Sequence, residues 1–451
     1  MEKIILFIKK NIYYFFFFFC LFITFFILYN NLGYDALWEY GMSHAITKGL
    51  LPYNDFNTVS TPLFIFLFSI GLFIYDSFFV FLLEFCLFYS IIFYFLYKMI
   101  GKKTIFVFLV MNIFLFSSFI PSYNTLSFGL IVIILYFEKN KSSDYLIGFL
   151  LGLLILSKHT IGIPIFILTC IGTFNFQQII KRLIGVIGPI IVFLIYLFLT
   201  HSFFSFIDLC FLGLFDFGSK NAVSFSPIHV LCIIIFFINM FFILKNKNNI
   251  LLYYSLGSIM FTIPICDISH SVYYLSIFFI VLLCMDIIYL KRDNYIYFYI
   301  LFFILLLFIN ILPRMSSFTQ ARLSNFNHYQ FTLIHEVGKE LTENVLNRVS
   351  SYDNYVFISY KGMFFDIIAD RDITYFDIPL TGNYGYKGTL KMMNKVHNMH
   401  DYYFLIDYEM YNGIKRKELK NEQLDVDLIE YIIHNSKRIG KVEDLVIYYK
   451  K

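Results

Sequence analysis

Ionisable side chains that could do chemistry gather in one polar stretch near the N-terminus, residues 30–62, between two strongly apolar regions. The stretch carries Asp35, Glu39, His44, Lys48, Asp55 and the only tryptophan of the chain, Trp38. A carboxylate close to a membrane lies near a low dielectric, where its ionisation can be tuned. A positioned carboxylate that takes a proton from an acceptor hydroxyl contributes roughly 10²–10⁴-fold in rate. The acids of this stretch are therefore the candidate catalytic residues.

The spacing of the three acids suggests how they would be arranged. Glu39 follows Asp35 by four residues, so both carboxylates share a face if this stretch is helical. Asp55 follows Pro52, a helix breaker, at a place where the chain must turn. The alternative interpretation is that all three are ordinary solvated loop acids.

A lysine lies between two short apolar runs, in the sequence Ser157-Lys158-His159-Thr160. A lysine at the centre of a membrane helix costs about 2.5–3.5 kcal/mol, so it needs a partner or a task. A lipid-linked phosphate or pyrophosphate is a fitting partner, because lysine binds phosphate as a point charge. The alternatives are a lysine that snorkels at a helix end and a histidine that serves as a structural hydrogen bonder.

Two further polar turns carry candidate residues. Asp267 lies three residues before His270, and such a pair could orient an acceptor sugar, although a short polar turn explains it equally well. The turn at 121–124 is predicted to line the cavity in which these residues would bind substrate. Metal binding would need further ligands that are not close in sequence. The predicted substrate-binding residues are Tyr53, His44, Tyr123, Lys158, His159, Asp267 and His270.

Composition indicates a polytopic α-helical membrane protein. Of the 451 residues, 59% are hydrophobic and 15% charged, whereas a soluble domain has about 25% charged residues.

The seven cysteines show no CxxC or Cys/His spacing, so neither a disulfide framework nor a zinc site is indicated. No Walker or Rossmann glycine pattern is present, which fits a donor that arrives attached to lipid. We predict no cofactor, no metal site and no nucleic-acid partner; whether a divalent ion assists stays open.

Apolar runs are predicted to form about eleven transmembrane helices, since about 20 apolar residues cross the hydrocarbon core. The runs are 11–29, 78–97, 104–120, 124–137, 145–157, 161–176, 183–200, 228–244, 250–266, 271–290 and 295–312. The segment Pro62–Tyr75 is too short for a span and is assigned to the first external loop, residues 30–77, as an interfacial or re-entrant helix.

Basic residues indicate the orientation of these spans, because lysine and arginine concentrate in cytoplasmic loops. If the spans alternate, all of the following clusters lie on one side: Lys3, Lys9, Lys10, Lys98, Lys102, Lys103, Lys139, Lys141, Lys181, Arg182, Lys245, Lys247, Lys291 and Arg292. The pattern predicts a multi-pass plasma-membrane protein with a cytoplasmic N-terminus. The candidate chemistry then lies outside.

The character of the chain changes at Arg314, after which it is polar. The runs 355–360 and 402–407 are typical of strands, and 388–400 and 426–435 of helices. We therefore predict two domains: a transmembrane catalytic domain over 1–313 and an extracytoplasmic α/β domain over 314–451.

The first loop resembles that of the GT-C superfamily of integral-membrane glycosyltransferases. The nearest branches are the protein O-mannosyltransferases, the aminoarabinose transferases and the rhizobial core-sugar (RgtA/B/C/D-like) transferases. The matching residues are Gly33-Tyr34-Asp35, Tyr40, Ala45-Ile46-Thr47-Lys48-Gly49, Pro52-Tyr53-Asn54-Asp55-Phe56 and Thr61-Pro62-Leu63. The resemblance implies a GT-C-like fold with Asp35 as the catalytic base.

Two later features are also similar to that superfamily, namely the basic residue before a later span, Lys158, and the external pair Asp267 and His270. One feature differs. The mannosyltransferases carry two adjacent acids after the first span, whereas Ala36 follows Asp35 here. This difference argues against the protein-mannosylating branch. It leaves open whether Glu39 or Asp55 supplies the second carboxylate.

The expected function is therefore transfer of a sugar from a polyprenyl-phosphate donor to a glycan, lipid or protein acceptor at the outer face of the bilayer. A transporter or flippase for lipid-linked glycans is the main alternative, and a glycan polymerase or ligase is a closer one. Transporters place charges inside their spans and often show internal repeats, and neither feature is evident in this sequence. A purely structural membrane protein would leave the acids of the first loop unexplained.

Overall fold

A computed structural model describes residues 16–25, 34–109, 111, 119–173, 175–220, 227–245, 249–263, 268–285, 339–380, 382–408, 412 and 425–451. The chain divides into two compact units, which are described separately below. Unit 1 comprises residues 1–31, 79–193 and 224–329, and unit 2 comprises residues 32–78, 194–223 and 330–451. The expected span 295–312 and the expected domain boundary at residue 313 lie outside the described residues.

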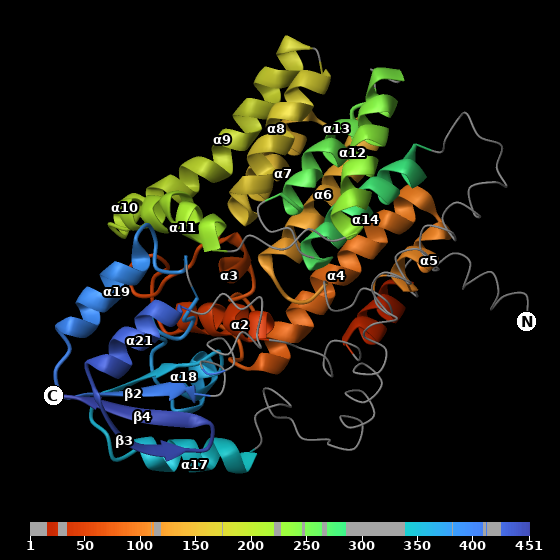
Figure 1. Ribbon diagram of the computed structural model, residues 1–451. Coiled ribbons are helices and arrows are strands. Elements are labelled where there is room, and N and C mark those ends of the chain that lie inside the picture. The colour runs from red at the N-terminus through yellow and green to blue at the C-terminus, as the bar shows by residue number, and fades with distance from the viewer. Residues whose placement is uncertain are drawn as a thin grey trace, which may run out of the picture. The chain divides into compact units, whose positions relative to one another are not determined.

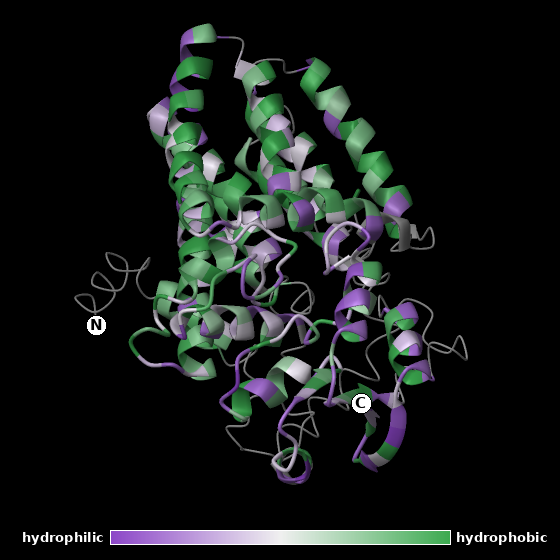
Figure 2. Ribbon diagram, turned by 90° about the vertical axis from the view of Figure 1, so that its left-hand side faces the viewer, coloured by the Kyte–Doolittle hydropathy of each residue, from purple (hydrophilic) through white to green (hydrophobic). Residues whose placement is uncertain are grey.

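Apolar helices form unit 1 (Figure 1). They are Phe16–Phe25, α4 (Phe78–Ile100), α5 (Lys103–Leu109), α6 (Tyr123–Lys139), α7 (Asp144–Ser157), α8 (His159–Thr173), α9 (Phe176–Leu199), α12 (Pro227–Lys245), α13 (Leu251–Gly257), η3 (Ser258–Phe261) and α14 (Ile268–Cys284). The last residues of α9 belong to unit 2. Hydrophobic residues cover most of these helices, as Figure 2 shows.

Three of the described helices are long and apolar enough to cross a membrane: Phe78–Ile100, Phe176–Leu199 and Ile228–Lys245. Shorter apolar helices of 10–17 residues occupy the positions of other expected spans, at Phe16–Phe25, Asp144–Ser157, His159–Thr173, Leu251–Phe261 and Ser269–Cys284. The helical character of the expected membrane region is confirmed for these described segments. The number of about eleven spans stays a prediction.

Glycines let α7 and α9 pack closely. A side chain at Gly148 would place its Cβ 2.1 Å from the carbonyl O of Arg182, and one at Gly152 would lie 2.8 Å from that of Val186. Small residues allow such close contact between helix backbones in membranes. The α7 helix ends where Lys158 adopts an extended conformation, and α8 begins at the next residue.

Unit 2 combines helices with a four-stranded sheet. Its helices are α2 (Tyr34–Thr47), α3 (Leu63–Leu67), α10 (Phe203–Ile207), η2 (Asp208–Leu212), α11 (Gly213–Lys220), α17 (Lys339–Val349), α18 (Gly362–Ile368), α19 (Gly388–His397) and α21 (Val426–His434). Its strands are β1 (Tyr355–Ile358), β2 (Tyr402–Asp407), β3 (Lys437–Val442) and β4 (Leu445–Lys450). The predicted strands at 355–360 and 402–407 and the helices at 388–400 and 426–435 correspond to β1, β2, α19 and α21.

The sheet has the order β1-β2-β4-β3, with β1 and β2 parallel and the other pairs antiparallel. Alternating residues of its strands enter two hydrophobic clusters, because successive side chains of a strand point to opposite faces. One cluster joins Phe404 and Ile406 to side chains of α19 and α21. The other joins Phe357 and Leu405 to side chains of α17 and α18. The sheet is therefore covered on both faces.

Candidate functional site

The first predicted site segment forms the helix α2 in unit 2. Asp35 lies exposed in its first turn, where a negative charge interacts favourably with the helix dipole. Glu39, one turn later, is only 4% exposed. The stretch is thus helical, which was the condition for Asp35 and Glu39 to share a face. The two carboxylates nevertheless differ strongly in burial. Of the two, Asp35 is the acid in contact with solvent.

The C-terminal part of α2 holds a histidine–carboxylate pair. The Nδ1 atom of His44 lies 2.7 Å from Oδ2 of Asp76, and the Tyr40 ring packs at 5.9 Å from the imidazole. The hydroxyl of Thr47 donates to the same carboxylate oxygen at 3.4 Å. Asp76 was not among the sequence candidates, and its position just before an apolar run was the only available signal. The pair joins the end of α2 to the start of α4.

Asp55 organises the loop that follows α2. Its Oδ2 atom accepts a hydrogen bond of 2.7 Å from the backbone N–H of Leu51, and its Oδ1 atom accepts one of 3.0 Å from the Asn54 amide. The chain turns at Tyr53, whose φ of 70° is in the left-handed region. The structure therefore gives Asp55 a role in holding this turn.

Tyr53 is buried beside that turn. Its hydroxyl donates to the carbonyl O of Ser60 at 2.6 Å, and its ring packs edge-on against Phe206. Burial, with a further contribution from Cys210, raises the pKa of the Tyr53 phenol well above its usual value. A phenol with such a pKa stays protonated and cannot serve as a base at neutral pH. The Tyr53 side chain therefore connects the first loop to α10 through its contact with Phe206.

The C-terminal region of unit 2 packs on the helix that carries Asp35. Leu37 belongs to one hydrophobic cluster of the sheet, and Trp38 packs against the other. Gly41 allows close contact with α18, since a Cβ there would lie 2.1 Å from Sδ of Met363. The exposed pair of Lys48 and Asp370 adds an ion pair of 2.6 Å. This hydrogen bond raises the pKa of Lys48 and lowers that of Asp370.

A second group of predicted residues meets in unit 1. The ammonium of Lys158 donates to Oδ1 of Asn124 at 2.6 Å, and the Asn124 amide nitrogen lies 3.3 Å from Nε2 of His270. The ammonium also lies over the rings of Tyr123 and Phe261, at 5.3 and 5.7 Å from their centroids. We call these five residues the Lys158 cluster. Three separate sequence candidates, Tyr123, Lys158 and His270, thus come together.

Short-range structure explains how these residues are placed. The side chain of Ser122 caps α6 by accepting from the N–H of Thr125 at 3.3 Å, which fixes the start of the helix that carries Tyr123 and Asn124. The break between α7 and α8 presents Lys158 at the end of α7. Asn124 belongs to the turn at 121–124 that was predicted to line the cavity, but it was not named among the binding residues.

The remaining predicted residues have other outcomes. His159 is buried, with 7% exposure, at the start of α8. Asp267 lies outside the described residues, so the expected pair with His270 stays a prediction. Among the residues that the structure describes, no group of three or more His, Cys, Asp or Glu side chains could hold a metal ion.

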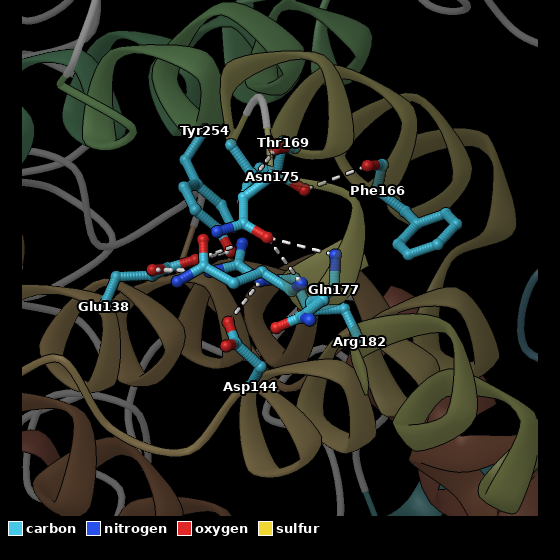
Figure 3. A network of polar contacts seen from close by, with 10 residues as sticks. Glu138, Asp144, Phe166, Thr169, Asn175, Gln177, Arg182 and Tyr254 are labelled. Carbon is cyan, nitrogen blue, oxygen red and sulfur yellow. Dashed lines mark hydrogen bonds and ion pairs between the residues drawn. The ribbon is translucent and has the colours of Figure 1, made fainter. Parts of the chain in front are cut away.

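A buried ionic network lies elsewhere in unit 1 (Figure 3). The Arg182 guanidinium contacts both Glu138 oxygens, at 2.7 and 3.1 Å, and its Nε donates to Asp144 at 3.0 Å. The Tyr254 hydroxyl donates to Glu138 at 2.7 Å. Four helices therefore contribute to this network. Its groups satisfy one another, which is the usual arrangement of a structural ion cluster.

Comparisons with known proteins give one similarity. No protein-family model matches the sequence, and no curated protein matches it. Among solved structures, the chain is similar to the crystal structure of the Archaeoglobus fulgidus oligosaccharyltransferase complex with Zn and sulfate, with 13% sequence identity and a TM-score of 0.44. The match covers 96% of this chain and 72% of that chain. We draw no conclusion about activity from a similarity of this size.

Proposed function

We propose that this protein is an inverting membrane glycosyltransferase that uses a polyprenyl-phosphate sugar. The acceptor hydroxyl attacks the anomeric carbon and gives its proton to Asp35. The bond between that carbon and the phosphate oxygen breaks, and the polyprenyl phosphate leaves with the electron pair. Lys158 binds the donor phosphate, and the acceptor is an extracytoplasmic glycan, lipid or protein.

The Lys158 cluster is the observation that carries this proposal. An amide oxygen accepts a hydrogen bond from the ammonium, and two aromatic rings lie against it. A lysine fixed in this way at the end of an apolar helix is suited to an anionic headgroup. His270 adds a second group that can donate a hydrogen bond, bonded to the same asparagine.

The second part of the support is the position of Asp35. Its carboxylate is exposed in the first turn of α2, whereas Glu39 is buried and Asp55 accepts hydrogen bonds from its own loop. An exposed carboxylate is accessible to an acceptor hydroxyl. We therefore assign the base to Asp35 and a supporting role to Asp55.

The test is transfer by the purified protein in liposomes. Radiolabelled polyprenyl-phosphate sugars and candidate acceptors are supplied, and sugar transfer is scored separately from movement of the labelled lipid across the bilayer. We expect transfer. Lipid movement without transfer would support a flippase and would refute the proposal.

Two variants test the assigned residues. Asp35→Asn is expected to reduce kcat by roughly 10²–10⁴-fold with the protein still folded, because the base is lost. Lys158→Gln is expected to weaken donor binding by roughly 10–100-fold, the loss typical of a charge-assisted hydrogen bond of about 1.5–3 kcal/mol.

Lys139→Gln is the matched control, because Lys139 also ends a helix and donates to a backbone carbonyl, that of Met99 at 2.8 Å. It should leave donor binding unchanged. A fully active Asp35→Asn protein would remove the base assignment. Equal effects of Lys158→Gln and Lys139→Gln would remove the phosphate assignment.

A further inference from the structure

The segment that follows α9 in unit 2 exposes large apolar side chains. It consists of α10, η2 and α11, residues 203–220. Phe204 is 84% exposed, Phe215 70% and Leu212 42%. Side chains of this size are rarely so exposed to water in groups, and such groups mark surfaces that bind a partner or a membrane.

This apolar surface is continuous with that of a candidate membrane span. The last turns of α9 expose Ile195, Phe198 and Leu199, of which Leu199 is 76% exposed. The ring of Phe198 stacks on that of Phe203, with centroids 5.1 Å apart and planes inclined by 9°. The stacked rings of Phe198 and Phe203 thus join the apolar end of this helix to α10 across the polar turn at 200–202.

Polar groups of the same segment bind the C-terminal region instead. Asp208 accepts a hydrogen bond of 3.3 Å from the N–H of Tyr386 and pairs with Lys391. Asp216 accepts one of 3.4 Å from the N–H of Gly388. The segment therefore has carboxylates that bind residues 386–391 and large apolar side chains that are exposed.

A glycine makes this contact possible. Gly385 has a φ of +79°, and a Cβ there would lie 2.2 Å from Oδ2 of Asp208. Only glycine tolerates both this conformation and this approach. The loop before α19 is thus fitted to the carboxylate of Asp208.

We propose that α10, η2 and α11 lie in the membrane interface, with Phe204, Leu212 and Phe215 inserted among the lipid headgroups and upper acyl chains. Helices with an apolar side and a charged side bind membranes in this manner. The carboxylates of Asp208 and Asp216 then attach the C-terminal region to this membrane-bound segment. The occupant of the apolar surface is lipid, because the surface continues from a helix that is itself long and apolar enough to cross the bilayer.

Tryptophan fluorescence in lipid nanodiscs tests this proposal. Trp38 is the only tryptophan and packs against the sheet, so it supplies a fixed baseline and a check of folding. Phe204→Trp and Phe215→Trp each add a probe in the proposed surface. Ile439→Trp adds a control probe on β3, where Ile439 is 41% exposed. Each variant is measured with phosphatidylcholine brominated near the top of the acyl chains and, separately, with aqueous acrylamide.

We expect brominated lipid to quench the added emission of Phe204→Trp and Phe215→Trp several-fold more than that of Ile439→Trp, and acrylamide to show the reverse order. Quenching of the two probes by acrylamide and not by lipid would overturn the proposal, since the surface would face water. Protection from both quenchers would also overturn it, because a protein partner or a second copy would then cover the surface. A variant that shifts the Trp38 baseline is replaced by Leu212→Trp.

Discussion

The indole N–H of Trp38 donates a hydrogen bond of 3.2 Å to the backbone carbonyl O of Tyr360, and the two rings pack with centroids 5.8 Å apart. Tyr360 follows β1, so this contact attaches the helix that carries Asp35 to the end of a strand of the C-terminal sheet. Because the chain has no other tryptophan, its fluorescence reports this attachment directly.

The close packing of α2 on α18 makes the effect of an alanine at Gly41 depend on Met363. Alanine in place of glycine normally stabilises a helix by up to about 1 kcal/mol. Here the new Cβ would lie 2.1 Å from Sδ of Met363, so the methionine must move. We expect Gly41→Ala alone to destabilise the unit by about 1 kcal/mol, measured by urea unfolding followed through Trp38 emission.

The same substitution in a Met363→Ala background should be neutral or stabilising, because the contacting side chain is gone. Met363→Ala alone is the control, since it removes the contacting side chain without adding a Cβ at Gly41. If Gly41→Ala costs the same amount of stability with and without Met363, the close contact is not what limits this position.

Two buried carboxyl groups predict a pH dependence for unit 2. Asp366 and Asp377 are both fully buried. Burial raises the pKa of Asp377 to about 6, and burial together with the neighbouring Asp377 raises that of Asp366. Arg371, 3.3 Å from Asp366, opposes the shift of both groups. The folded state therefore retains protons that the unfolded chain releases above a pH of about 4.

The stabilisation that the bound protons provide is complete at a pH below the pKa that the aspartates have in the unfolded chain. It is lost as the pH rises toward about 6, the pKa of Asp377 in the folded protein. The loss should reach about 2–3 kcal/mol, since each pKa unit corresponds to about 1.4 kcal/mol. Urea unfolding followed through Trp38 between pH 4 and pH 8 measures it. Asp377→Asn should flatten the curve because it removes the group that titrates toward about 6, whereas Asp372→Asn, a change at an exposed acid nearby, should not. Stability that rises between pH 4 and pH 6 would contradict the shared burial of these carboxyls.

Several elements were predictable because their signals are local. The apolar runs predicted the helices of unit 1, and the short strand-like runs at 355–360 and 402–407, rich in aromatic and branched residues, predicted β1 and β2. The strands β3 and β4 were not predicted. The β3 strand is the edge of the sheet and is mostly exposed, so its sequence lacks the alternation that marks a half-buried strand.

The site was predictable only as separate segments. Sequence spacing cannot show that Asn124 links Lys158 to His270, because the contact joins residues 34 and 146 positions apart. Sequence spacing also cannot distinguish the roles of neighbouring charged residues. Lys181 and Arg182 looked equivalent as cytoplasmic charges, yet Lys181 is exposed and Arg182 is buried among carboxylates. Burial depends on helix packing, which a single sequence does not display.

Asp55 offers a test of structural against catalytic function. If it only holds the turn, Asp55→Asn should keep most of the transfer activity, because the amide oxygen can still accept from the N–H of Leu51. Asp55→Ala should destabilise the loop by about 1 kcal/mol, since the N–H then lacks its partner. Transfer rates and proteolysis of the loop in both variants measure this. Complete loss of kcat in Asp55→Asn, with the loop intact, would make Asp55 a catalytic acid.

Arg182 and Lys181 form a matched pair for the ionic network of unit 1. Arg182→Gln leaves the Glu138 carboxylate buried, and that of Asp144 partly buried, without their cation; removal of one partner of a buried ion pair typically costs about 3–5 kcal/mol. Lys181→Gln removes the same charge from the next position, where the side chain is exposed, and should change stability by no more than about 0.5 kcal/mol. Chemical denaturation in nanodiscs, followed by the circular dichroism of the helices, compares the two. Equal losses would show that the cationic charge at this end of α9 matters, rather than the contacts of Arg182 with Glu138 and Asp144.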